Sequence, residues 1–326
     1  MKKRLISFFI VMILLPIFVV YAAKTGSIEI TFSELVKGLL TGTNENVAII
    51  KDLRFPRIII ALFAGATLSV AGVLLQAVMR NPLAEPGIIG VSAGAGFVTM
   101  MMLAFFPTLF FFAPLFAFIG GALAFILVFT FSWKSGLNPL RMILIGVAIN
   151  AIFSGLSEVL LARGNGLLNA VSVSTSSLSM KTWQDVEIIV TYGSIGLLLA
   201  FIFYQYGNHL ALKDETLKSL GFHVNRARVI ISVIAVLLAA ITTAVAGMFT
   251  FVGLLIPHIG RLLVGTDHKY LLPFSALAGA LLILMADTIG RTIMAPIEIP
   301  ASIIMVIIGG PFLIYLLRKS ERIYGN

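Results

Sequence analysis

Ionisable side chains inside apolar stretches are the residues of this sequence with the most obvious chemical potential. Glu158, Asp287 and Arg291 lie within or at the end of long apolar runs. A charge at the centre of a membrane span costs about 2.5 to 3.5 kcal/mol on insertion scales. Asp287 and Arg291 are four residues apart, so they share a helix face and can neutralise one another. We expect a structural ion pair near the outer end of a span. The alternative, a proton or sodium pathway, would need several such groups at mid-depth.

Motifs for catalysis and for cofactor binding are missing from the sequence. It has no Gly-x-x-x-x-Gly-Lys-[Ser/Thr] phosphate loop and no His-Glu-x-x-His metal motif. It has no cysteine, which excludes thiolate metal sites and cysteine nucleophiles. His258 has no second metal-ligating residue at helical spacing. We therefore expect a chain that is not an enzyme and binds no metal or nucleotide itself.

The composition is that of an integral membrane protein. The chain has 326 residues, a mean hydropathy of +1.06 and 11% charged residues, where a soluble domain has about a quarter. Repeated apolar runs of about 20 residues predict an all-α polytopic membrane protein in which residues 1–326 form a single domain. The net charge of +9 comes from Lys and Arg in short loops beside apolar runs. These charges are typical of topology signals and not of a nucleic-acid site.

About ten membrane spans are predicted, with residues 24–55 as an outer loop. The expected spans cover residues 5–23, 56–79, 88–106, 109–132, 139–162, 188–208, 229–247, 250–265, 271–291 and 301–317. With both termini in the cytoplasm, 15 of the 23 Lys and Arg residues fall in cytoplasmic segments. This distribution agrees with the positive-inside rule.

The order of the spans predicts an inverted repeat with halves at about 56–162 and 227–318. The second and seventh spans cross in opposite directions, and each leads into a segment broken by glycine. Small residues four positions apart, as Gly90 and Gly94 are, let helices approach closely. The same residues could also line a translocation path, which is compatible with packing. The residues assigned to packing or to the path are Gly87, Gly90, Ser92, Gly94, Gly253 and Pro257.

Residues 210–228 are a polar segment between apolar runs. Apolar Leu217 and Leu220 alternate with charged residues, and Gly221 follows directly. This pattern predicts a short amphipathic helix with a glycine stop in the cytoplasm. Either Leu217 and Leu220, or the preceding Leu210 and Leu212, are expected to face a partner.

Several longer motifs resemble the FecCD family of ABC importer permeases, which take up iron siderophores, haem and cobalamin. The Arg80-Asn81-Pro82-Leu83-Ala84-Glu85-Pro86-Gly87 run carries much of the resemblance. The other matching stretches are 53–57, 65–76, 88–95, 217–224, 251–258, 262–268, 286–291 and 309–312.

The resemblance implies a type II ABC importer permease fold in the bacterial cytoplasmic membrane. It implies a homodimeric or pseudo-dimeric pore and an extracellular or periplasmic substrate-binding (lipo)protein. It also implies two cytoplasmic ATPases that use ATP and Mg²⁺, while this chain binds no cofactor. Segment 210–228 corresponds to the family's coupling helix, which contacts the ATPase. The residues implied in this contact are Glu215, Leu217, Lys218, Ser219, Leu220 and Gly221.

The substrate is expected to be an iron chelate, either haem or a ferric siderophore. The run from Ser179 to Trp183 resembles permeases of Gram-positive haem-uptake systems, whereas Val173 to Leu178 lacks the Trp and Gly that many family members have. A cobalamin permease of the same family is one alternative. An ion-gradient-driven secondary transporter and a regulatory membrane subunit without a pore are alternatives from other classes.

Overall fold

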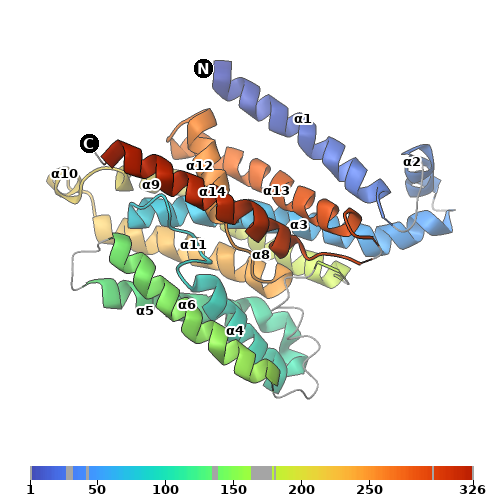
Figure 1. Ribbon diagram of the computed structural model, residues 1–326, viewed down its shortest axis with the longest axis horizontal. Coiled ribbons are helices and arrows are strands. Elements are labelled where there is room, and N and C mark those ends of the chain that lie inside the picture. Colours follow the sequence, from blue (N-terminus) through green and yellow to red (C-terminus); the bar gives the residue numbers. More distant parts are fainter. Residues whose placement is uncertain are drawn as a thin grey trace.

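The computed structural model describes residues 2–26, 32–41, 44–133, 139–162, 178–179, 181–295 and 297–324. Within these ranges the regular structure is entirely helical (Figure 1). The helices are α1 (Lys2–Lys24), α2 (Phe32–Thr41), α3 (Glu45–Met79), α4 (Val91–Phe105), the 3₁₀ helix η1 (Pro107–Phe112), α5 (Ala113–Trp133), α6 (Pro139–Ala162), α8 (Trp183–Ile202), α9 (Tyr204–Leu210), α10 (Asp214–Ser219), α11 (Val224–Ala246), α12 (Val252–Val264), α13 (His268–Thr292) and α14 (Ala301–Tyr324).

The prediction of an all-α polytopic membrane protein is confirmed. Seven of the described helices are long and apolar enough to cross a membrane. The shorter apolar helices α4, α12 and α14 stand where three further spans are predicted. Each of the ten predicted spans therefore has its own apolar helix.

The outer loop predicted at residues 24–55 is wrong in part, because much of it is helical. α2 lies within it, and α3 begins at Glu45 and continues through Pro56. Val47 and Ile50 are three residues apart on one helix face, and both are almost fully buried. Packing of that face extends the helix beyond the strictly apolar run.

The sixth span begins earlier than predicted, at Trp183, because a capping box sets its start. The Thr182 hydroxyl accepts a hydrogen bond from the Asp185 backbone N–H, and the Thr182 backbone N–H donates to the Asp185 carboxylate at 2.9 Å. This reciprocal pair of hydrogen bonds satisfies the backbone N–H groups of Thr182 and Asp185, which have no partner within the helix at its start.

Helix α3 forms the centre of the molecule. It packs against α8, α11, α12 and α13, and Figure 1 shows it passing between them. Gly65 lies against the backbone of Gly279 in α13, and Gly72 lies against the backbone of Gly253 in α12. A Cβ atom at Gly65 or Gly72 would collide with these carbonyl groups, so glycine is required for the close approach.

Helices α4, α5 and α6 form a second group beside α11 (Figure 1). Gly94 of α4 faces Gly120 of α5, and a side chain on either would meet the other's backbone. This second group belongs to the first half of the sequence and packs on α11 from the second half. The two predicted halves therefore share one packed body.

Candidate functional site

Segment 210–228 contains the short helix α10 and a turn that ends it. The Gly221 N–H donates to the Lys218 carbonyl at 3.0 Å, and the Phe222 N–H donates to the Leu217 carbonyl at 2.9 Å. Gly221 has a φ of 73°, in the left-handed region. These two bonds and the positive φ are those of a Schellman turn, in which glycine is favoured. The helix and its glycine stop lie where the sequence pattern predicts them.

The leucines of this segment follow neither of the two predicted registers. Leu217 is 1% exposed and Leu210 is fully buried, so both pack into the molecule. Leu220 is 73% exposed and Leu212 is 47% exposed. The surface offered to a partner therefore combines one leucine from each predicted pair, Leu212 and Leu220.

The tip of α10 is open to solvent. Among the residues assigned to ATPase contact, Leu217 is the one that is buried. The exposed residues are Glu215, Lys218, Ser219, Leu220 and Gly221. Leu217 thus anchors the tip from inside, and the exposed residues are accessible to a partner protein.

Two arginines fasten α10 to the spanning helices. Arg80 follows α3 directly and contacts the Asp214 carboxylate at 2.6 Å, while its Nε donates to the Leu210 carbonyl at 2.9 Å. Arg228 of α11 contacts the same Asp214 oxygen at 3.0 Å. A displacement of α10 would therefore pull on the ends of both α3 and α11. Arg80 belongs to a motif of the family resemblance, but its contact with Asp214 was not predicted.

Glu85 joins the two glycine-broken segments. Its carboxylate, 1% exposed, accepts a hydrogen bond from the Phe251 N–H at 2.9 Å and another from the Leu254 N–H. Burial raises the pKa of Glu85 to about 7, although these backbone bonds act in the opposite direction. Phe251 precedes α12, so the turn after α3 caps the first turn of a helix from the other half. Glu85 stands in the 80–87 motif, but this role of its carboxylate was not predicted.

The residues predicted to pack helices or line a path are all buried within the chain. Gly90 has a φ of 85°, and a side chain there would press on the Asn150 backbone. A side chain at Gly87 would meet Thr250, across the contact between the two broken segments. In this conformation these residues pack one segment of the chain against another. The buried set is Gly87, Gly90, Ser92, Gly94, Gly253 and Pro257.

Asp287 and Arg291 lie in a larger charged network than the predicted pair. Their side chains are 3.6 Å apart, but Arg57 of α3 contacts both Asp287 oxygens, the shortest distance being 2.8 Å. Arg291 also donates to the Ala22 carbonyl at 2.9 Å. The expectation of one pair on one helix was therefore incomplete, because the principal partner of Asp287 comes from another helix.

Glu298 extends this network toward the loop before α8. Arg57 contacts Glu298 at 2.8 Å, and the Ser179 hydroxyl donates to the same carboxylate at 2.6 Å. Burial favours a higher pKa for Glu298, but the hydrogen bonds from Ser179 and Arg57 outweigh it and lower that pKa. Residues 173–177 and Met180, used in the substrate prediction, lie outside the described residues.

Comparison with known proteins gives full-length matches. Residues 13–319 match the FecCD transport family. IsdF of Staphylococcus aureus strain MSSA476, named as a probable haem-iron transport system permease protein, is 41% identical over 322 residues, with 98% of each chain covered. The same protein from strain MW2 matches equally well.

Solved structures give the same result for the fold. A metal-chelate type ABC transporter in an inward-facing conformation is 28% identical, with a TM-score of 0.80 over 97% of this chain and 99% of that chain. PsaBC from Streptococcus pneumoniae, in complex with Fab, shares the fold at 16% identity, with a TM-score of 0.61 over 87% of this chain and 95% of that one. The resemblance stated from the motifs is confirmed: this chain belongs to the FecCD transport family.

Proposed function

We propose that this chain is the permease subunit of an ABC importer that carries an iron chelate, with haem as the first candidate, across the bacterial plasma membrane. The full-length similarity to a haem-iron permease protein carries this proposal. The metal-chelate type transporter of the same fold supports it. The chelate is cargo and undergoes no chemistry on this chain.

In this proposal, ATP hydrolysis by partner subunits supplies the energy for transport. The exposed tip of α10 docks on a cytoplasmic ATPase that binds ATP and Mg²⁺, which places both termini of this chain in the cytoplasm. ATPase closure displaces α10, and the Asp214 contacts to Arg80 and Arg228 transmit the displacement to α3 and α11. Such a rigid-body switch alternates access between the two sides of the membrane.

The proposal also includes two partners outside the cytoplasm. A second permease subunit, identical or paralogous, completes the pore, and an extracellular or periplasmic binding protein delivers the chelate. The choice among haem, a ferric siderophore and cobalamin is expected to rest mainly with that binding protein.

The secondary-transporter alternative receives less support from the charged network. A carrier of protons needs a carboxylate that binds and releases a proton during transport. Asp287 instead forms salt bridges with two arginines, Arg57 and Arg291, as a carboxylate with a structural role does.

Reconstitution tests the proposal. Proteoliposomes with the permease, its ATPase and the binding protein should accumulate haem when ATP is inside, and a partner ATPase inactivated in its phosphate loop should abolish uptake. Ferric siderophore and cobalamin serve as competing cargoes. Uptake driven by a sodium or proton gradient without the ATPase would overturn the assignment to an ABC importer.

A further inference from the structure

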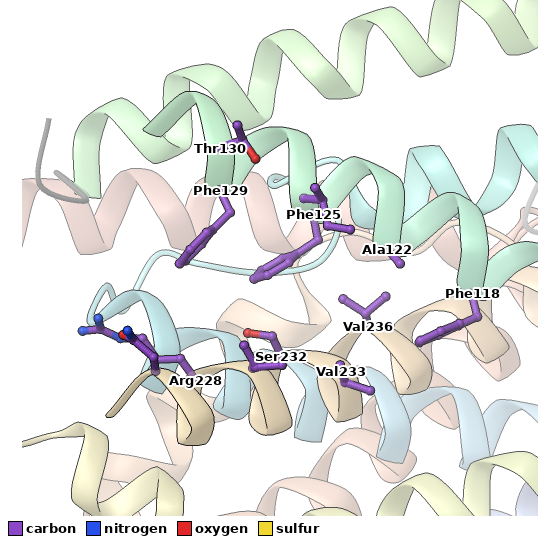
Figure 2. Close-up of a pocket in the computed structure, with 12 residues that line it drawn as sticks. Phe118, Ala122, Phe125, Phe129, Thr130, Arg228, Ser232, Val233 and Val236 are labelled. Atoms are coloured by element: carbon purple, nitrogen blue, oxygen red, sulfur yellow. The ribbon is translucent and has the colours of Figure 1, made fainter. Parts of the chain in front are cut away.

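A narrow apolar groove of about 370 Å³ lies between α5 and α11 (Figure 2). Phe118, Phe125 and Phe129 of α5 form one wall, and Val229 and Val233 of α11 contribute to the other. Val229 is 62% exposed and Val233 is 47% exposed. The groove therefore opens on a surface of a membrane protein that is apolar enough to face acyl chains.

The groove has the length of one membrane leaflet. On α11 its lining runs from Asn225 to Val236, which is about 16 Å at the helical rise of about 1.5 Å per residue. The hydrocarbon core of a bilayer is about 30 Å thick, so the groove reaches from one end of the span to about the middle. An acyl chain of a single phospholipid has this extent and this polarity.

Polar groups gather at one end of the groove. Figure 2 shows Arg228 at the end opposite Phe118 and Ser232 nearer the middle, and Asn225 also lines the groove. Arg228 and Arg80 contact the same oxygen of Asp214, so these three groups carry one uncompensated positive charge. Arg228 Nε is buried and has no hydrogen-bond partner among the described residues. A buried donor without a partner is costly, and the Arg228 side chain, which is 12% exposed, presents its remaining surface to an anion at this end.

We propose that this groove binds one acyl chain of an anionic phospholipid, with the lipid phosphate at Arg228. An anionic head and an apolar tail match the two ends of the groove, and basic pockets between helices on the cytoplasmic side are known to suit such lipids. Placing Arg228 in the cytoplasmic leaflet rests on the proposed orientation. The phosphate would share Arg228 with Asp214, so the lipid would touch the same contact that fastens α10.

Lipid retention by the purified full-length chain tests the site. The protein is taken from nanodiscs with equal amounts of phosphatidylglycerol and phosphatidylcholine, and bound lipids are counted by native mass spectrometry. We expect the wild type to retain phosphatidylglycerol preferentially. Arg228→Gln should reduce that preference about five-fold, the effect of one basic residue near the surface. The matched control is Arg226→Gln, which changes an exposed arginine two residues away and should keep the preference.

A second variant distinguishes an effect of the groove from an effect of the Arg228 contact with α10. Val233→Trp fills the groove and leaves Arg228 and Asp214 unchanged, so it should lower retention of both lipids. Leu198→Trp on α8, at a position that is 59% exposed and outside the groove, is its control. The proposal is overturned if wild type and Arg228→Gln retain both lipids equally. It is also overturned if a photocrosslinker at Val233 captures a second copy of the chain instead of lipid.

Discussion

At the scale of the residue, Arg57 forms salt bridges with two carboxylates from other parts of the chain. Its guanidinium contacts Asp287 and Glu298 while its side chain is only 9% exposed. Removing one partner of a buried ion pair leaves the other charge uncompensated, which costs about 3 to 5 kcal/mol. Arg291 at 3.6 Å would compensate part of that loss.

We therefore predict that Arg57→Gln lowers the free energy of unfolding by about 3 kcal/mol, the lower end of this range. Thermal unfolding in detergent, followed by fluorescence, measures the effect. Arg226→Gln, at an exposed position, is the control and should unfold like the wild type. An unchanged midpoint for Arg57→Gln would show that the network does not stabilise the fold.

Glu85 should make stability depend on pH. Its pKa is about 7 in the folded chain, above the ordinary value of 4.5, so the folded state holds a proton that the unfolded state releases. The neutral form contributes its full stability below about pH 4.5, and this contribution is lost as pH rises to about 7. The loss is on the order of 3 kcal/mol.

Glu85→Gln keeps the shape of the side chain and removes its titration. We predict that the wild type loses thermal stability relative to this variant between pH 5 and pH 7.5, and that the difference stays constant above that range. Melting midpoints of both proteins over the same buffers measure it. Parallel pH profiles would contradict the raised pKa of Glu85.

At the scale of the element, the crossing of α3 and α12 depends on two glycines. Gly72→Val would push a side chain into the Gly253 backbone, so the helices must separate. Overpacking of this kind costs about 1 to 3 kcal/mol and sometimes more. We predict a lower yield of folded protein in size-exclusion chromatography.

The control for the crossing is Gly155→Ala in α6, where a Cβ would meet no described atom within 4 Å. Alanine favours a helix over glycine by about 1 kcal/mol, so this variant should fold at least as well as the wild type. If both variants gave equal yields of folded protein, the close approach of α3 and α12 would not explain why position 72 is glycine.

The two faces of α10 should respond differently to substitution. Leu220→Asp alters the exposed tip and should abolish co-purification of the ATPase while the melting midpoint stays unchanged. Leu217→Ala removes a buried side chain and should lower stability by about 2 to 5 kcal/mol. Normal co-purification with Leu220→Asp would refute the role of the tip in docking.

At the scale of the whole molecule, Asp214 of α10 is bound both by Arg80, which follows α3, and by Arg228 of α11. Arg80 joins α10 to the centre of the fold through Asp214, and its Nε also holds the end of α9 through the Leu210 carbonyl. We predict that Arg80→Gln leaves ATPase docking intact but lowers the amount of chelate transported per ATP hydrolysed, because Arg228 alone then holds Asp214.

Uptake and ATP turnover measured in the same proteoliposomes test this prediction. Arg226→Gln again serves as the control, since Arg226 is exposed at the start of α11. A proportional fall of both rates in Arg80→Gln would mean that the contact supports folding or docking and does not transmit motion.

The sequence alone determined which segments are apolar enough to cross a membrane, where α10 ends and which family the chain belongs to. These properties depend on local composition: apolar runs partition into lipid wherever they stand, and Gly221 adopts its positive φ within its own turn. The family motifs are likewise contiguous, so they can be read without knowing the fold.

The tertiary structure alone decided which distant residues meet. Arg57 and Asp287 are 230 positions apart, and Glu85 and Phe251 are 166 positions apart. Periodicity places a side chain on a face of its own helix but does not say which other helix packs there. For the same reason the sequence left two leucine pairs as alternatives for a partner surface, whereas tertiary packing buried one leucine of each pair and left Leu212 and Leu220 exposed.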